Sequence, residues 1–346
     1  MITRLVLSCL ALAVSVTAAG TSADAPTGLQ HDVAFAAFPA YAKNGELLRR
    51  LVSPLNAARI ERGLAGNPAA LQALPLDPSQ QRFALYVPPG PPPAGGYALL
   101  VFVPPWDDAR VPPQWIPALD RHHVIFVSAA HSGNDADVLN RREPLALLAA
   151  YGVMQRYRVD PARVYVGGFS GGSRIALRLA LGYPDVFRGA LLDAGSDPIG
   201  NAQIPLPPAE LFHRFQQSTR IVFLTGEDDN IRQAQMAHAR ESLHDWCVFD
   251  VDSVTMRSVS HDLADAQGFG QALDDLAEPA ALDRAALADC RAGIEARMKA
   301  QLLAVRRLLD SHRNGDAQTL LRNIDAQYGG LAAPQTTALM DSTGAH

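Results

Sequence analysis

The chain has 346 residues, of which 48% are hydrophobic and 19% are charged, and its formal net charge is -5. This composition provides for a large apolar core and excludes a generally disordered protein. No long basic block occurs, so we expect no nucleic-acid partner.

The first 25 residues have the layout of a secretory signal peptide. One arginine precedes an apolar run over residues 5–16, and small residues follow it. Cleavage would follow Ala18, Ala19 or Ala25. The apolar run is shorter than the ~20 residues that a membrane span needs. We therefore expect export, to the periplasm or the medium, with no stable membrane anchor after cleavage.

Residues 26–77 form an N-terminal extension that contains one helical piece, "ELLRRLVSPLNAARIERGL", and no strand alternation. Residues 78–278 are different, because apolar runs alternate there with amphipathic stretches. The runs include "YALLVFVPP", "HHVIFVSAA", "ARVYVGG" and "TRIVFLTG". Continuous apolar runs are typical of strands that are buried on both faces. The sequence thus predicts an α/β domain with a doubly wound, mostly parallel sheet.

Residues 279–334 predict a helical hairpin packed on this core. Apolar side chains recur there at helical spacing, at Ile294, Met298, Leu302, Val305 and Leu309. A second helix should end at the glycine pair 329–330. We expect the hairpin to serve as structural cover, and the tail over residues 335–346 to be poorly ordered.

Two cysteines, Cys247 and Cys290, remain after removal of the signal peptide. An oxidising compartment allows them to form a disulfide. The alternative is a pair of buried thiols, and spacing along the chain does not distinguish the two.

The stretch "VYVGGFSGGSRIA" contains G-x-S-x-G, with Ser170 at its centre. An apolar strand precedes the motif and a helical pattern follows it, which is the layout of a nucleophile elbow. Glycines 168, 171 and 172 provide the small neighbours that such a sharp turn requires. The alternatives are a dinucleotide-binding loop, whose G-x-G-x-x-G spacing is not met cleanly, and a glycine turn with an inert serine.

A nucleophilic serine needs a base and a group that orients the base, in the chain order Ser, Asp or Glu, His. The loop after "RIVFLTG" carries three acids, and Asp229, three residues past Gly226, is the preferred one. Asp228 is the second choice, and Asp197 is a more distant alternative. His261 follows the next strand and is the predicted base.

An oxyanion hole needs two backbone N–H groups. Gly171, directly after the serine, should supply one of them. The other should come from the loop after "YALLVFV". Pro104 and Pro105 have no N–H, so Trp106 is the first residue of that loop that is able to donate.

The segment "DPARVYVGGFSGGSRIALRLALGYPDVFRGAL" resembles the elbow region of secreted esterases of the polyhydroxybutyrate-depolymerase and feruloyl-esterase type. The resemblance implies an α/β-hydrolase fold, a triad of Ser170, Asp229 and His261, and a bacterial exported esterase. Two departures occur. Pro104-Pro105 replaces the His-Gly that is usual in the family, and Ser260 replaces the glycine before the histidine.

The sequence therefore predicts a serine hydrolase of carboxylic esters, with a small-molecule or polymeric ester as substrate and without metal or cofactor. One alternative is a serine peptidase of the oligopeptidase kind on the same triad. A missing propeller or other large gating domain argues against it. The other alternative is a non-enzymatic binding protein, and the presence of all three triad candidates argues against that.

Overall fold

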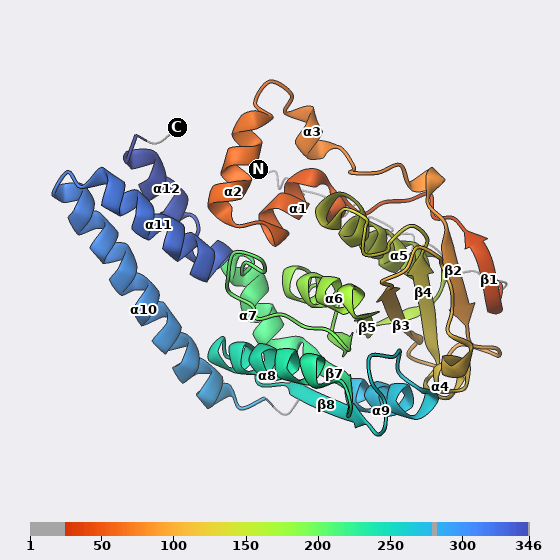
Figure 1. The fold of residues 1–346 in the computed structure, drawn as a ribbon. Coiled ribbons are helices and arrows are strands. Elements are labelled where there is room, and N and C mark those ends of the chain that lie inside the picture. The colour runs from red at the N-terminus through yellow and green to blue at the C-terminus, as the bar shows by residue number, and fades with distance from the viewer. Residues whose placement is uncertain (1–24, 279–281, 345–346) are drawn as a thin grey trace, which may run out of the picture.

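The computed structural model describes residues 25–278 and 282–344. The predicted signal peptide, apart from Ala25, lies outside these residues. Within the described chain, eight strands form one sheet in the order β1-β2-β4-β3-β5-β6-β7-β8 (Figure 1). Their bounds are β1 (Gly28–Val33), β2 (Phe83–Val87), β3 (Tyr97–Val103), β4 (Val124–Ala129), β5 (Val159–Phe169), β6 (Gly189–Asp193), β7 (Arg220–Gly226) and β8 (Val251–Met256).

Strand β2 runs antiparallel to both β1 and β4, and all other neighbouring strands are parallel. This order and direction are those of the α/β-hydrolase fold, so the chain has the predicted fold class. The central strands are buried along their whole length, as in β3, "YALLVFV". Helices cover both faces and explain why these strands read as continuous apolar runs.

The two faces of the sheet carry separate apolar clusters. Helices α5 (Glu143–Arg156), α6 (Gly171–Gly182) and α8 (Asn230–Asp245) cover one face. Helices α4 (Ile116–His122) and α9 (Ala266–Ala277) cover the other. The carboxyl ends of the parallel strands therefore open between two helical layers, where ligands bind in open α/β sheets.

The N-terminal extension differs from the prediction in two respects. It contributes the edge strand β1, whose residues include only one buried side chain, that of Val33, so the strand shows no apolar alternation. The predicted single helix is two helices, α1 (Asn44–Leu51) and α2 (Pro54–Gly63), because Pro54 begins a new helix. A short helix α3 (Ala69–Gln72) follows.

The C-terminal region contains the predicted hairpin and one helix more. Helices α10 (Arg284–Asp310) and α11 (Asn314–Tyr328) pair and continue into α12 (Gln335–Ser342). The expectation of a poorly ordered tail is thus wrong for residues 335–342. Helix α12 contacts α2, so the two additions to the core lie side by side (Figure 1). Helix α7 (Ala209–Ser218) lies between the C-terminal helices and α6, whereas α1 contacts α6 directly. Within the described residues, no helix has the length and apolar content that a bilayer span needs.

Cys247 and Cys290 form a disulfide with a Cα–Cα distance of 5.9 Å. It joins the segment after α8 to α10 across 43 residues of sequence. Both sulfurs lie where the C-terminal helices meet the core. The disulfide thus attaches the first long C-terminal helix to the α/β core.

Replacing both cysteines by alanine is expected to lower the free energy of unfolding by about 4 kcal/mol, because the unfolded chain loses a 43-residue loop constraint. Cys247 has φ 61°, a strained backbone conformation for cysteine and alanine alike. The backbone strain is therefore the same in wild type and variant and does not contribute to the difference in stability. Urea unfolding of the wild type and the double variant measures the difference. Wild type under reducing conditions should match the variant, and the variant should not respond to the reductant. Equal stability of the oxidised wild type and the variant would contradict the prediction.

Candidate active site

Ser170 occupies a sharp turn between the end of β5 and the start of α6. Its backbone has φ 54° and ψ -117°, a strained conformation for a residue with a side chain. The turn closes tightly because its neighbours lack side chains. A Cβ on Gly168 would collide with the backbone of Gly172, and one on Gly172 would collide with the Val103 carbonyl. The glycines thus permit the close approach that presents Ser170 at the carboxyl end of the sheet.

His261 and Asp229 lie beside Ser170 in the predicted chain order. His261 Nε2 is 3.0 Å from Ser170 Oγ, and His261 Nδ1 is 2.7 Å from Asp229 Oδ2. Asp229 is buried, whereas the His261 side chain is 39% exposed. A carboxylate that accepts from Nδ1–H leaves Nε2 free to accept the serine proton. The three side chains therefore have the geometry of a nucleophile, a base and an orienting acid.

Of the three competing acids, the structure brings Asp229 to His261. Asp228 is exposed, and its backbone N–H donates to the Val259 carbonyl. Asp197 forms an ion pair with Arg174 at 3.4 Å. Asp229 also begins α8, where its Oδ1 accepts from the Arg232 N–H at 3.2 Å. One carboxylate thus caps a helix and contacts the histidine.

Both predicted oxyanion donors lie next to the elbow. Gly171 is the first residue of α6, so its N–H has no partner within the helix. Trp106 lies in the loop after β3, and no described acceptor pairs with its backbone N–H. Its indole ring packs against Phe169 with centroids 6.3 Å apart, and the Arg110 guanidinium lies 4.0 Å above it. Trp106 therefore contributes an aromatic wall beside the serine as well as a free N–H.

Phe169, which precedes the serine, was not singled out from the sequence. Its ring stacks on the His261 imidazole with centroids 5.1 Å apart. The x position of G-x-S-x-G has no defined residue type, so the motif gives no signal for this contact. The stacking limits the rotation of the half-exposed imidazole about its Nδ1 hydrogen bond.

The loop that carries His261 is fixed through Ala264. The Ala264 N–H donates to Asp193 Oδ2 at 2.9 Å, and the Ala264 carbonyl accepts from Trp115 Nε1 at 2.8 Å. The Asp193 carbonyl accepts from the Ser170 N–H at 2.8 Å. One buried residue at the end of β6 thus contacts both the serine turn and the histidine loop. Nothing in the sequence distinguishes Asp193 from a turn acid, because this link is a tertiary contact.

Asp193→Asn is expected to flatten the pH dependence of stability. Burial raises the pKa of Asp193 from 3.8 to about 8, although the Ala264 N–H opposes the shift. Between these pH values the folded protein holds a proton that the unfolded chain has lost, so wild-type stability falls as pH rises. Asparagine keeps an acceptor for Ala264 without titrating. Urea unfolding at about pH 5 and about pH 8 measures the slope. The exposed-site control Asp228→Asn should keep the wild-type slope, and parallel curves for Asp193→Asn would contradict the prediction.

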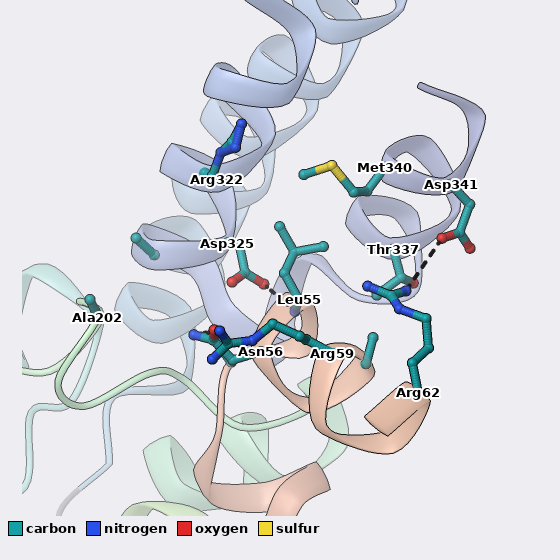
Figure 2. A pocket seen from close by; sticks show the side chains of 13 residues that line it. Leu55, Asn56, Arg59, Arg62, Ala202, Arg322, Asp325, Thr337, Met340 and Asp341 are labelled. Atoms are coloured by element: carbon teal, nitrogen blue, oxygen red, sulfur yellow. Dashed lines mark hydrogen bonds and ion pairs between the residues drawn. The ribbon is translucent and has the colours of Figure 1, made fainter. Parts of the chain in front are cut away.

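A cavity of about 420 Å³ lies elsewhere, between α2, α11 and α12 (Figure 2). Its lining shares no residue with the serine site. Asp325 has a structural role in this cavity, because its Oδ1 accepts a hydrogen bond of 3.0 Å from the Leu55 N–H at the start of α2. Arg62 pairs with Asp341 at 3.9 Å. Among the described side chains, no group of three or more His, Cys, Asp or Glu is arranged to hold a metal ion. The serine site is therefore the candidate active site.

No protein-family model matches the sequence. A 54-residue segment, 16% of the chain, is 50% identical to the "Putative esterase NocK" of Nocardia uniformis subsp. tsuyamanensis, and it spans only 14% of that protein.

Solved structures that resemble the chain include S-formylglutathione hydrolase FrmB of Staphylococcus aureus, with 12% identity, 57% of this chain and 93% of that chain covered, and a TM-score of 0.45. The feruloyl esterase module of Clostridium thermocellum shares 14% identity over 57% of this chain and 82% of its own, with a TM-score of 0.42. A protein of Bacteroides ovatus described as a "putative dipeptidyl aminopeptidase IV" shares 13% identity, with 56% of this chain and 32% of that chain covered, and a TM-score of 0.40. Both esterases and peptidases thus occur among these structures, and such weak likeness does not assign an activity.

Proposed function

We propose that the protein is a serine esterase that cleaves carboxylic esters through an acyl-enzyme on Ser170. The observation that carries the proposal is the continuous chain of contacts from Ser170 Oγ to His261 Nε2 and from His261 Nδ1 to Asp229 Oδ2, at 3.0 and 2.7 Å. A serine in an inert glycine turn does not require a histidine at that distance with a buried carboxylate behind it. The elbow strain at Ser170 supports the same proposal.

In this mechanism Ser170 Oγ attacks the ester carbonyl carbon as His261 Nε2 takes the hydroxyl proton. The carbonyl π electrons move to oxygen, and the N–H groups of Gly171 and Trp106 donate to that oxyanion. When the C–O bond to the alcohol breaks, His261 returns the proton to the leaving alkoxide. Water then attacks the acyl-enzyme with His261 as base, which releases the acid and restores Ser170. Asp229 holds the imidazole in the required tautomer throughout.

Labelling with a fluorophosphonate probe tests the nucleophile. The purified mature protein should form a stable covalent adduct, and Ser170→Ala should not. Ser173→Ala is the matched control, because Ser173 lies one helical turn further and its hydroxyl donates to backbone carbonyls. This variant should still label. An adduct that survives in Ser170→Ala would reject Ser170 as the nucleophile.

A substrate panel tests the ester assignment. p-Nitrophenyl esters of increasing acyl length, feruloyl esters and a polyhydroxyalkanoate suspension should be compared with aminoacyl-p-nitroanilides. Because p-nitrophenyl esters are intrinsically more reactive than anilides, ester hydrolysis without measurable anilide cleavage supports an esterase, and efficient cleavage of the anilides supports the peptidase alternative. The sequence resemblance favours the polyhydroxybutyrate-depolymerase and feruloyl-esterase type within the ester class.

We further propose that the protein acts outside the cytoplasm. The N-terminal sequence has the layout of a signal peptide. The Cys247–Cys290 disulfide supports the same proposal, because disulfides form and persist in oxidising compartments. Fractionation of the host cell, followed by mass spectrometry of the N-terminus, would test export and identify which of Ala18, Ala19 and Ala25 precedes the cleavage.

A further inference from the structure

The side chain of Asn134 lies directly against Gly171, the predicted oxyanion donor, and its Oδ1 is the atom closest to where a Gly171 Cβ would be. A Cβ on Gly171 would collide with the Asn134 carboxamide, so this amide group covers the residue whose N–H faces the predicted oxyanion. Asn134 is exposed, and no described group forms a hydrogen bond with its side chain. A free donor and a free acceptor are thus placed at the mouth of the site.

The loop that carries Asn134 is held to the loop of Trp106 by a set of hydrogen bonds. The Asn134 N–H donates to the Pro105 carbonyl at 3.1 Å. The buried Arg142 guanidinium donates to the Ser132 and Pro104 carbonyls, each at 2.9 Å. Both loops are therefore fixed before any substrate arrives, which is the condition under which a donor stabilises developing charge effectively.

Arg142 has a further consequence for these loops. Burial lowers the pKa of its guanidinium to about 10, and the neighbouring Glu143 opposes that shift. The group is therefore a cation at neutral pH, and both of its bonded partners are backbone carbonyls of the two loops. Loss of either bond would leave one N–H group of a buried cation unpaired, so the two loops have little freedom to separate.

The chemistry of the opposite loop explains why an additional donor would be useful. Pro104 and Pro105 remove two consecutive N–H groups from the segment after β3. Trp106 is then the first residue of that segment whose N–H can complement Gly171. A side-chain amide next to Gly171 provides a donor that this segment lacks, and side-chain amides are effective oxyanion donors.

We propose that Asn134 is a catalytic residue whose Nδ2–H donates to the oxyanion beside the Gly171 N–H. The proposal rests on the proposed function of Ser170 and extends it. Turning of the terminal amide, which no hydrogen bond fixes, brings Nδ2 toward the oxyanion. The donation strengthens as charge develops on the carbonyl oxygen, so it favours the transition state over the bound ester.

Steady-state kinetics with a p-nitrophenyl ester test the proposal. Asn134→Ala should lower kcat by about 10²–10³-fold with little change in KM. Asn134→Asp removes both amide donors and places a carboxylate there, so it should lose at least as much activity at neutral pH. Asn140→Ala is the matched control, since Asn140 is exposed in the same loop region and its side chain has no described hydrogen-bond partner. It should retain wild-type kcat.

A trifluoromethyl ketone forms a tetrahedral adduct with a serine. Its affinity distinguishes a donor to the oxyanion from a residue that only supports the loop. Its affinity should fall by the same factor as kcat/KM in Asn134→Ala, while inhibition by the free acid product stays unchanged. Asn134→Leu, which has a similar shape and no donor, serves as the second variant in case alanine disturbs the loop.

The outcomes separate this proposal from the one on which it rests. If wild type reacts with the fluorophosphonate at Ser170 but Asn134→Ala and Asn134→Leu keep kcat within twofold, the role of Asn134 is rejected and the esterase assignment stands. If wild type does not react at Ser170, the proposed function itself fails. An equal loss of acid-product binding and ketone binding would also reject a donor specific to the oxyanion.

Discussion

Replacing His261 by alanine is expected to lower kcat for ester hydrolysis by about 10⁶-fold. Without Nε2 at 3.0 Å, Ser170 Oγ has no base to take its proton, and the leaving alkoxide has no acid. Stopped assays with a p-nitrophenyl ester over long incubation measure the residual rate. In the proposed mechanism the three residues act as a unit, so the double variant Ser170→Ala/His261→Ala should be no slower than either single variant.

His238→Ala is the matched control for this experiment. His238 is an exposed histidine on α8 that makes no described contact with Ser170. Its removal should leave kcat within about twofold of wild type. A His261→Ala variant that keeps more than a tenth of the wild-type kcat would contradict the assignment of His261 as the base.

Asp229→Asn is expected to lower kcat by about 10⁴-fold while preserving the fold. The asparagine amide replaces Oδ2, which accepts from His261 Nδ1 at 2.7 Å, and an amide N–H cannot accept. The imidazole is then held in the wrong tautomer. The remaining Oδ1 still accepts from the Arg232 N–H, and asparagine is a good N-cap, so α8 should stay intact. Kinetics and thermal unfolding should be measured on the same preparation.

The neighbouring acid gives the comparison for this variant. Asp228→Asn changes the same charge one residue earlier, on an exposed side chain. It should keep wild-type kcat within about twofold. Equal losses in the two variants would indicate a general electrostatic effect of the loop and would contradict the role of Asp229. A normal rate in Asp229→Asn would do the same.

The sequence is most informative where local chemistry and chain order restrict the choices. The continuous apolar runs predict the buried strands, and the glycines around Ser170 predict the tight elbow because only they avoid backbone collisions. The order of serine, acid and histidine, together with a place directly after the next strand, favours His261 as the base. The choice of Asp229 over Asp228 rested on a turn pattern, and in the structure Asp229 is the acid that lies at His261.

Other features are absent from the sequence pattern for identifiable physical reasons. Strand β1 has one buried side chain, so periodicity cannot reveal it. Asp193 contacts Ala264, which lies 71 positions later in the chain. Asn134 lies against Gly171, 37 positions later, and neither contact leaves a trace in the local sequence. Helix α12 lies against α2 at the opposite end of the chain, and short weakly amphipathic segments of this kind depend on such a partner.

The hydrogen bond from the Leu55 N–H to Asp325 has a consequence for the order of folding. The two residues are 270 positions apart, and Asp325 accepts from an N–H in the first turn of α2. An emerging α2 segment therefore lacks this acceptor until residue 325 has been made. Helix α2 should gain its full protection from hydrogen exchange late, together with the C-terminal helices, rather than with the sheet that follows it in the chain.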